Sequence, residues 1–224
     1  MIIKTLIAVS STTLLAALSA QAQASFQNLN FEQADPIVVP GTPYVTEASA
    51  LPEWTVTIGG VQETEITENA PSLGAPWVSL VGPGDESNTP IDGNYSVLLQ
   101  GSAPAEAASI DQIGLIPFNA RSLQFKAFGG GGILDLQVGT ATVPFTALET
   151  EPTYTLYGAN ISAWADETEQ LTFSALGDSS QPNDWEIDDI SFSTNVVASP
   201  EPSLVALSAI GGLLCGARRW LARR

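Results

Sequence analysis

The side chains that could carry chemistry in this chain are almost all carboxylates. The 224-residue sequence has 24 Asp and Glu residues, no His, and a single Cys, Cys215. Triads and general bases built on His are therefore excluded, as are zinc or iron sites that need imidazole or thiolate ligands. Carboxylates leave two main options, which are binding a hard cation such as Ca²⁺ and hydrolysing a glycosidic bond with a pair of acids.

Acidic residues gather at three places in the middle of the chain. These are Glu63, Glu65 and Glu68; Asp85 and Glu86; and Asp166, Glu167 and Glu169. Two suitably spaced carboxylates would suffice for glycoside hydrolysis, but among so many acids some pair always looks suggestive. Nothing singles out an acid with a raised pKa, and Glu63 and Glu65 are predicted to share one solvated strand face. We therefore interpret the chain as not an enzyme, with a two-carboxylate glycan-processing enzyme as the less favoured alternative.

Residues 1–24 have the three parts of a secretion signal. Lys4 gives a positive start, residues 6–18 are apolar apart from Ser and Thr, and Ala22-Gln23-Ala24 is the small-x-small pattern that signal peptidase accepts. The apolar run is short for a membrane span, which needs about 20 residues. We expect a signal-peptide helix cleaved before Ser25, in preference to a membrane anchor.

Residues 199–224 form the second targeting segment. Pro200, Glu201 and Pro202 precede an apolar stretch over 204–217, and four arginines close the chain: Arg218, Arg219, Arg223 and Arg224. This order resembles the PEP-CTERM sorting signal, which implies that an exosortase recognises and removes the tail during export in Gram-negative bacteria that make exopolysaccharide. A hydrophobic helix backed by arginines should contact a membrane with its charged end in the cytoplasm. The alternative is a plain C-terminal membrane anchor, and both place the protein outside the cytoplasm, in the cell envelope or the extracellular matrix.

The domain between these ends, residues 25–198, is strongly acidic. It keeps two basic residues, Arg121 and Lys126, against 23 acidic ones. Binding to phosphate backbones depends on Lys and Arg that are absent here, so nucleic acid is excluded as a partner. Such an acidic exported domain favours divalent cations, solubility outside the cell, or both.

The pattern of this domain predicts strands throughout. Apolar and polar residues alternate over short stretches between turn residues, at 54–58, 95–99, 123–127, 134–138, 154–157, 171–173 and 187–192. No stretch of twelve or more residues has a convincing helical period. The sequence therefore predicts an all-β protein with a single jelly-roll β-sandwich. The glycines of 129–132 are predicted to form a hairpin connection, and the turn-rich segment 82–93 is predicted to be a mobile or ligand-contacting loop.

The two ends of the domain carry a further resemblance. Asn28-Leu29-Asn30-Phe31-Glu32 and Leu51-Pro52-Glu53-Trp54 lie near its start, and Asp-Trp-Glu-Ile-Asp-Asp-Ile-Ser-Phe occupies 184–192. This order resembles the galactose-binding-like jelly rolls found among carbohydrate-binding modules, although Glu53 stands where that family usually has Gly. The resemblance implies that the first and last strands are neighbours. It also implies that Glu32 and Asp188 hold a structural Ca²⁺, completed by backbone carbonyls.

A physical argument about Asp188 stands beside that resemblance. Asp188 shares strand parity with Ile190 and Phe192, so we expect it to face partly inward, where an unpaired charge is costly. With almost no basic side chains to pair with, a cation that takes oxygen ligands is the natural compensation. The alternative is a bulge or strand end that turns Asp188 to solvent.

Aromatic side chains are the remaining candidates for ligand contacts, because flat rings stack on the apolar faces of sugars. Trp54 and Trp185 lie in strand patterns and are predicted to be core residues. Trp77, Trp164 and Tyr44 lie nearer to loop signals and are the candidate ligand-binding residues, with packing in the core or at its rim as the alternative. We interpret the domain as a non-catalytic binder of extracellular polysaccharide. A structural or adhesive surface protein that binds other proteins is the alternative.

Overall fold

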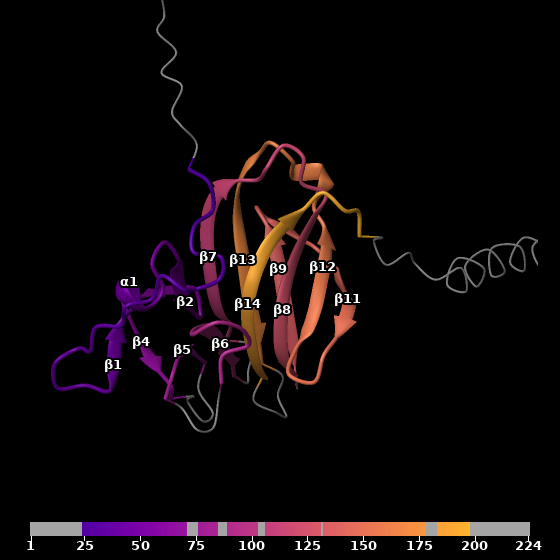
Figure 1. The fold of residues 1–224 in the computed structure, drawn as a ribbon. Coiled ribbons are helices and arrows are strands. Elements are labelled where there is room, and N and C mark those ends of the chain that lie inside the picture. Colours follow the sequence, from indigo (N-terminus) through magenta and orange to yellow (C-terminus); the bar gives the residue numbers. More distant parts are fainter. Residues whose placement is uncertain are drawn as a thin grey trace, which may run out of the picture.

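The computed structural model describes residues 24–70, 76–84, 89–102, 106–130, 132–177 and 183–197. Almost all of the regular secondary structure in this part of the chain belongs to two β-sheets (Figure 1). The predicted sorting tail and, apart from Ala24, the predicted signal peptide lie outside the described residues. Within those residues, no helix has both the length and the hydrophobicity to span a membrane.

The larger sheet has eight strands, and its strand order is not the chain order. In space it runs β1 (Tyr44–Thr46), β4 (Glu65–Glu68), β5 (Trp77–Val81), β6 (Ser96–Gly101), β14 (Asn183–Ser193), β8 (Ser122–Gly130), β12 (Thr155–Asn160) and β11 (Phe145–Thr150). Neighbouring strands are antiparallel except for β4 and β5, which are parallel.

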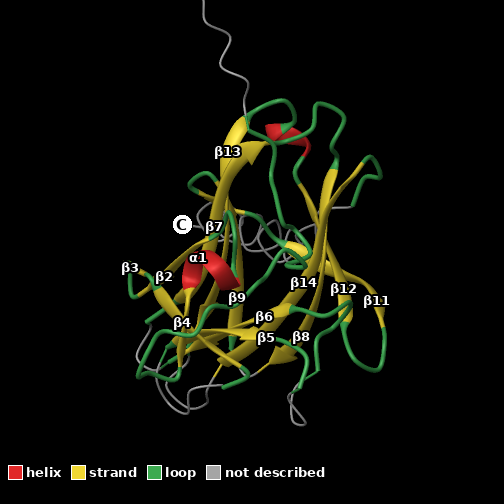
Figure 2. Cartoon of the chain, turned by 60° about the vertical axis from the view of Figure 1, so that its left-hand side comes forward, coloured by secondary structure: helices red, strands yellow, loops and turns green. Residues whose placement is uncertain are grey.

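The smaller sheet has six strands and is antiparallel throughout. Its order is β10 (Ala141–Thr142), β9 (Ile133–Val138), β13 (Thr168–Leu176), β7 (Ala108–Leu115), β2 (Thr55–Ile58) and β3 (Val61–Glu63). Helical structure in the described residues is limited to α1 (Glu47–Ala50) and a 3₁₀ turn, η1 (Ser162–Trp164) (Figure 2). The predicted all-β sandwich is therefore confirmed.

One core fills the space between the two sheets. Period-two alternation sends Phe125 of β8 and Phe173 of β13 inward, where their rings meet edge to face with centroids 5.0 Å apart. Trp54 is buried, and its Nε1–H donates to the carbonyl oxygen of Asn28 over 3.0 Å. Trp185 packs against the same core. The prediction that Trp54 and Trp185 are core residues is confirmed.

The glycine run 129–132 is not the predicted hairpin. β8 and β9, which it joins, lie in different sheets, so the segment carries the chain from one sheet to the other. Gly129 has φ +143°, and a Cβ there would lie 2.0 Å from the carbonyl oxygen of Asp184 in the adjacent β14. Glycine is required for this close approach of two strands, and a run of glycines does not by itself distinguish the two kinds of connection.

Two local expectations from the sequence are also wrong. Glu63 ends β3 and Glu65 begins β4, so these acids belong to different sheets and share no strand face. The resemblance implied that the first and last strands are neighbours, but the opening segment 28–34 lies in turns, with positive φ at Asn28 and Phe31, and three strands separate β1 from β14. Glu53 adopts φ 72°, so this position has the left-handed backbone that Gly favours even though it is Glu.

Candidate functional site

The outward face of the eight-stranded sheet carries a row of acids from the last strand. Along β14, Asp184, Glu186 and Asp188 alternate with Trp185 and Ile187, whose side chains belong to the core. The three acids therefore lie on the side of the sheet that faces away from the core.

Asp188 is buried, as expected, but for a different reason. Asp189 has φ 48°, and the pairing of β14 with β8 shifts register between Asp188 and Ser191. This bulge breaks the parity on which the sequence argument relied, because Ile190 and Phe192 pack toward the core while Asp188 pairs with Lys126 on the outer face. Asp188 is nonetheless 1% exposed. The loop that covers it, rather than the sandwich core, buries it.

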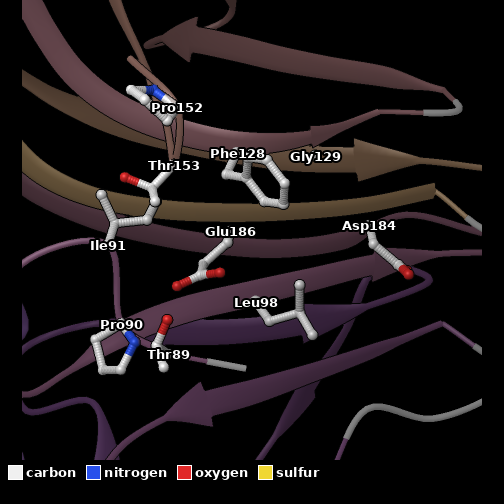
Figure 3. Close-up of a pocket in the computed structure, with 10 residues that line it drawn as sticks. All are labelled: Thr89, Pro90, Ile91, Leu98, Phe128, Gly129, Pro152, Thr153, Asp184 and Glu186. Atoms are coloured by element: carbon white, nitrogen blue, oxygen red, sulfur yellow. The ribbon is translucent and has the colours of Figure 1, made fainter. Parts of the chain in front are cut away.

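A groove of about 460 Å³ crosses this outer face (Figure 3). Its floor is formed by Leu98 of β6, Asp184 and Glu186 of β14, and Phe128 of β8, with segments 89–91 and 152–153 as its two rims. Glu186 is the register partner of both Leu98 and Phe128, so these three side chains form a single row across three strands. In Figure 3 the Glu186 carboxylate lies between the Phe128 ring and Pro90.

Glu186 is a carboxyl group held under one rim of the groove. It is 8% exposed and accepts hydrogen bonds from the Ser96 hydroxyl and from the backbone N–H of Ile91. Burial raises the pKa of Glu186, and the two hydrogen bonds oppose that rise without cancelling it. Beside it, Asp184 accepts a 2.9 Å hydrogen bond from the Gln100 amide. The groove floor therefore combines one exposed aromatic ring with two oxygen-rich side chains.

Glu32 binds the residues that follow the 89–91 rim along the chain. Its Oε1 accepts the backbone N–H groups of Asn94 and Tyr95 over 2.7 and 2.9 Å, and its Oε2 accepts the Asn94 side-chain amide over 2.9 Å. Burial opposes ionisation, but these hydrogen bonds outweigh it and lower the pKa of Glu32. Gly93, with φ 58°, sits against this carboxylate, and a Cβ there would lie 2.3 Å from Oε1. The turn at Gly93 is thus wrapped around an ionised acid.

Asp188 binds the backbone between Ile91, which donates to Glu186, and Asn94, which donates to Glu32. Its Oδ2 accepts the backbone N–H of Asp92 over 3.0 Å, and its Oδ1 accepts the N–H of Asp189 over 2.7 Å. Burial, reinforced by the charges of Asp189 and Asp92, raises the pKa of Asp188 to about 7. Glu186, Asp188 and Glu32 together bind the backbone of 91–95, which we call the rim loop.

Glu32 and Asp188 meet at a second, smaller cavity of about 110 Å³. The structure therefore brings the two predicted calcium ligands to one place, together with Asp92 and Asp189. The ammonium of Lys126 lies among these acids, bound to Asp92 and, over 2.6 Å, to Asp189. Burial alone would lower the pKa of Lys126, but the two aspartates raise it.

The fit of Ca²⁺ to this cavity is partial. Carboxylate oxygens are the ligands that Ca²⁺ takes, and a carboxyl group as buried as Asp188 would gain from a cation. Both predicted ligands, however, already accept N–H hydrogen bonds. Across the described ranges, no three Asp, Glu, His or Cys side chains are grouped so that they could hold a metal ion. A cation bound by Glu32 and Asp188 would need backbone carbonyls to complete its shell.

Two of the three predicted aromatic candidates come together. The rings of Tyr44 and Trp77 pack with centroids 5.6 Å apart, and the indole N–H of Trp77 is buried without a hydrogen-bond partner. Trp77 pairs with Gln100, which in turn pairs with Asp184, so this aromatic pair lies on the same face as the groove. Trp164 is placed elsewhere. It ends η1, at the top of Figures 1 and 2 away from β5 and β6, and packs against the core.

The groove residues were missed by the sequence reasoning. Phe128 lies next to the glycine run and is 57% exposed, but an aromatic residue in a strand pattern is more often a core residue. Asp184 and Glu186 precede Asp188 at spacings of two, and this alternation of acids along the closing strand was the available signal. Of the predicted loop 82–93, residues 89–91 do line the groove, while 85–88 lie outside the described residues.

Comparison with known proteins identifies structures but no family. No protein-family model matches the chain, and no curated protein does. A family 61 carbohydrate-binding module solved with β-1,4-galactotriose is 17% identical, with a TM-score of 0.45 over 77% of this chain and 99% of that one. The family 11 module from Clostridium thermocellum, solved with a β-1,3-1,4-mixed-linked tetrasaccharide, is 6% identical, with a TM-score of 0.35 over 70% of this chain and 97% of that one.

A third match has a catalytic description. The enzymatically active domain of tailspike protein 4 of bacteriophage CBA120 is 12% identical, with a TM-score of 0.36 over 74% of this chain and 21% of that one. Similarity at this level does not identify a function, so the function is argued from the groove and its residues.

Proposed function

We propose that the domain is a non-catalytic binder of polysaccharide, and that the glycan lies in the groove across β6, β14 and β8. The observation that carries this proposal is the open groove of about 460 Å³, with the exposed Phe128 ring on its floor beside Asp184 and Glu186. An aromatic ring offers a stacking surface to the apolar face of a sugar, and carboxylates accept hydrogen bonds from its hydroxyl groups. Concave sites with a few convergent polar groups are typical of ligand binding.

The Tyr44–Trp77 pair extends this proposed site. Trp77 stands two strands away from Asp184 in one register row, or about 10 Å at the usual strand spacing. A glycan chain that crosses the strands from Phe128 would therefore reach Trp77 within a few sugar units. Trp164 has no place in this path, because it does not line the groove and packs against the core.

Titration of the purified chain with a panel of soluble polysaccharides tests the proposal. Saturable binding to one glycan class, weakened by Trp77→Ala, is the expected result. Binding to no glycan by a folded protein would contradict it. Calcium-dependent self-association together with indifference to sugars would favour the alternative, a structural or adhesive surface protein that binds other proteins.

A second candidate function is glycoside hydrolysis, which one observation favours. Asp184 and Glu186 project from the same strand face into one groove, and the raised pKa of Glu186 is a property of a general acid. An enzyme would release reducing ends from the bound glycan, and Glu186→Gln would abolish the release. For a non-catalytic module we expect no reducing ends from any glycan that binds.

Calcium is the cofactor that we propose for the smaller cavity, with Glu32 and Asp188 as its protein ligands. The support is the burial of Asp188 and the shared cavity. Thermal unfolding should occur at a lower temperature after chelation, and Asp188→Asn should remove that sensitivity. A melting temperature that does not change with chelator would exclude the cation and leave the N–H hydrogen bonds as the whole role of these two acids.

Export and sorting are proposed on the sequence of the two ends alone. Signal peptidase would cleave before Ser25, and an exosortase would remove the tail that begins with Pro200, Glu201 and Pro202 after the tail has contacted the membrane. Mass spectrometry of the protein exported by a Gram-negative host, with and without an exosortase, tests both cuts. An intact C-terminus in the presence of the exosortase would indicate a plain membrane anchor.

A further inference from the structure

The groove is acidic, and the domain has almost nothing with which to neutralise it. Between residues 25 and 198 the sequence contains two basic residues, Arg121 and Lys126. Arg121 precedes Phe128 by seven residues, which corresponds to about 23 Å of extended chain. Lys126 shares the outer face with Phe128, but its ammonium is bound to Asp92 and Asp189. Neither cation is available to the groove floor.

Glu186 is the acid most affected by this shortage. It is 8% exposed, and the two groups that donate to it, the Ser96 hydroxyl and the Ile91 N–H, are both neutral. A ligand that covers the groove removes the remaining water from this carboxylate. A uronate would place a like charge against it, and a neutral sugar would remove water without supplying charge. An ammonium group would form a charge-assisted hydrogen bond and offset the burial.

The geometry brings such a group within reach. Glu186 and Phe128 are register partners on adjacent strands, and directly paired side chains have Cβ atoms about 5 Å apart. A pyranose ring stacked on Phe128 therefore presents one of its ring substituents to the Glu186 carboxylate. Asp184, one pair further along β14, stands beside the next part of the glycan.

We propose that the groove selects glycans whose sugars carry free amino groups, that it binds neutral glycans less tightly, and that it rejects glycans rich in uronic acids. This inference rests on the proposed function, since it concerns the charge class of the glycan in the same groove. Glu186 is the residue that determines the preference, and Asp184 adds to it.

Three β-1,4-linked hexasaccharides and one acidic oligosaccharide test the inference. The probes are hexamers of glucosamine, N-acetylglucosamine and glucose, and an oligogalacturonate of the same length, titrated into the full-length chain by calorimetry at neutral pH. We expect the glucosamine hexamer to bind about tenfold more tightly than its N-acetylated form, as for gain of a charge-assisted hydrogen bond. We expect no binding of the oligogalacturonate. Glu186→Gln should reduce the tenfold preference to about twofold or less.

Matched variants separate a preference set by Glu186 from a general attraction of cationic glycans to an acidic protein. Asp135→Asn removes one charge from the outer face of the other sheet, where Asp135 accepts a hydrogen bond from Gln137, and it should keep the full preference. Asp184→Asn should weaken the preference by a smaller factor than Glu186→Gln, and it serves as the test if Glu186→Gln does not fold.

The outcomes distinguish this inference from the proposed function. Equal binding of the three β-1,4 hexamers, or a preference that survives both Glu186→Gln and Asp184→Asn, overturns the charge selectivity and leaves polysaccharide binding intact. Binding of a hexalysine peptide as tight as that of the glucosamine hexamer also overturns it, because the groove would then recognise ammonium groups without recognising sugars. Failure of every glycan to bind overturns both.

Discussion

The two outer faces of the sandwich are built by the same alternation but handle their polar groups in different ways. On the six-stranded sheet, outward polar side chains bond to one another, as in Ser109 to Ser174 over 2.8 Å and Gln170 to Asp111 over 2.7 Å. On the eight-stranded sheet, side chains also bond to one another, as Gln100 does to Asp184, but Glu186 and Asp188 in addition accept backbone N–H groups of a loop. The polar side chains of the six-stranded sheet thus satisfy one another, whereas carboxylates of the eight-stranded sheet hold the rim loop over their face.

This difference shows how one face of a sheet can acquire a groove. Side chains that pair within a face leave it open, while acids that accept backbone N–H groups attach a rim and bury themselves beneath it. The groove lies between that rim and the 152–153 turn. The cost is a set of buried carboxyl groups in a domain with few cations.

The largest effect that we expect is a dependence of stability on pH through Asp188. Its pKa is about 7 in the folded state against 3.8 as the reference, so between these values the folded protein holds a proton that the unfolded chain has lost. Without metal, the free energy of unfolding should therefore fall as pH rises from 4 to 7, by on the order of 3 kcal/mol. Urea unfolding in chelator at pH 4, 5.5 and 7 measures this.

The control for this pH dependence is Asp135, on the outer face of the six-stranded sheet. Asp188→Asn should remove most of the fall, whereas Asp135→Asn should retain it. Bound Ca²⁺ would favour the ionised carboxylate and reduce the fall in the unsubstituted protein. A fall of the same size in Asp188→Asn would show that general repulsion among acids, and not this buried group, is its cause.

Removal of the Glu32 carboxylate should have the next largest effect. Glu32→Ala removes three hydrogen bonds to Asn94 and Tyr95, which we expect to cost about 2–3 kcal/mol of unfolding free energy. Amide exchange of Tyr95 should accelerate more than that of residues in the six-stranded sheet. Glu149→Ala, at an exposed position of β11, is the matched control and should change neither quantity. Equal acceleration throughout both sheets would mean that Glu32 supports the whole fold and not the rim loop.

Loss of the groove aromatic should affect binding without affecting the fold. Phe128→Ala removes the stacking surface, and glycan affinity should fall about tenfold, equivalent to ~1.4 kcal/mol. Phe118→Ala is a close control, because Phe118 is 77% exposed at the turn before β8 and away from the groove. Titration of both variants with the glycan measures this difference. An equal loss of affinity in the two variants would mean that the glycan does not stack on Phe128.

The smallest effect should come from the six-stranded sheet, whose outward polar side chains bond to one another. Ser174→Ala breaks the hydroxyl pair with Ser109 and leaves the buried Ser109 hydroxyl without this partner, so we expect a cost of about 1 kcal/mol and unchanged glycan affinity. Urea unfolding and the same titration provide the measurements. A loss of affinity in this variant would show that the six-stranded face takes part in binding.

Much of the fold could be predicted from the sequence, because period-two alternation reports which residues are buried. The stretches 123–127 and 187–192 are strands in the structure, and Trp54 and Trp185 pack in the core. Strand partners could not be predicted in the same way. Alternation does not encode which sheet a strand joins, so the glycine run was assigned to a hairpin although it connects two sheets.

The candidate site was predicted in part, for a related reason. Glu32 and Asp188 do meet, as the resemblance implied, but the bulge at Asp189 places Asp188 outside the core. A bulge is one extra residue in the pairing of two strands, and only the partner strand reveals it. Phe128 could not be singled out because its exposure depends on which strands flank β8 and on the height of the two rims.

The place of β14 in the larger sheet has a consequence for how the protein is made. β14 is the last strand of the described chain, yet it lies between β6 and β8 in the middle of its sheet. Until residues 183–193 have left the ribosome, β6 has only β5 beside it and β8 has only β12, so the long-range pairing that joins the two parts of the sheet must wait. The larger sheet therefore stays in two parts until its last described strand is made, an order that would suit the proposed export of the chain.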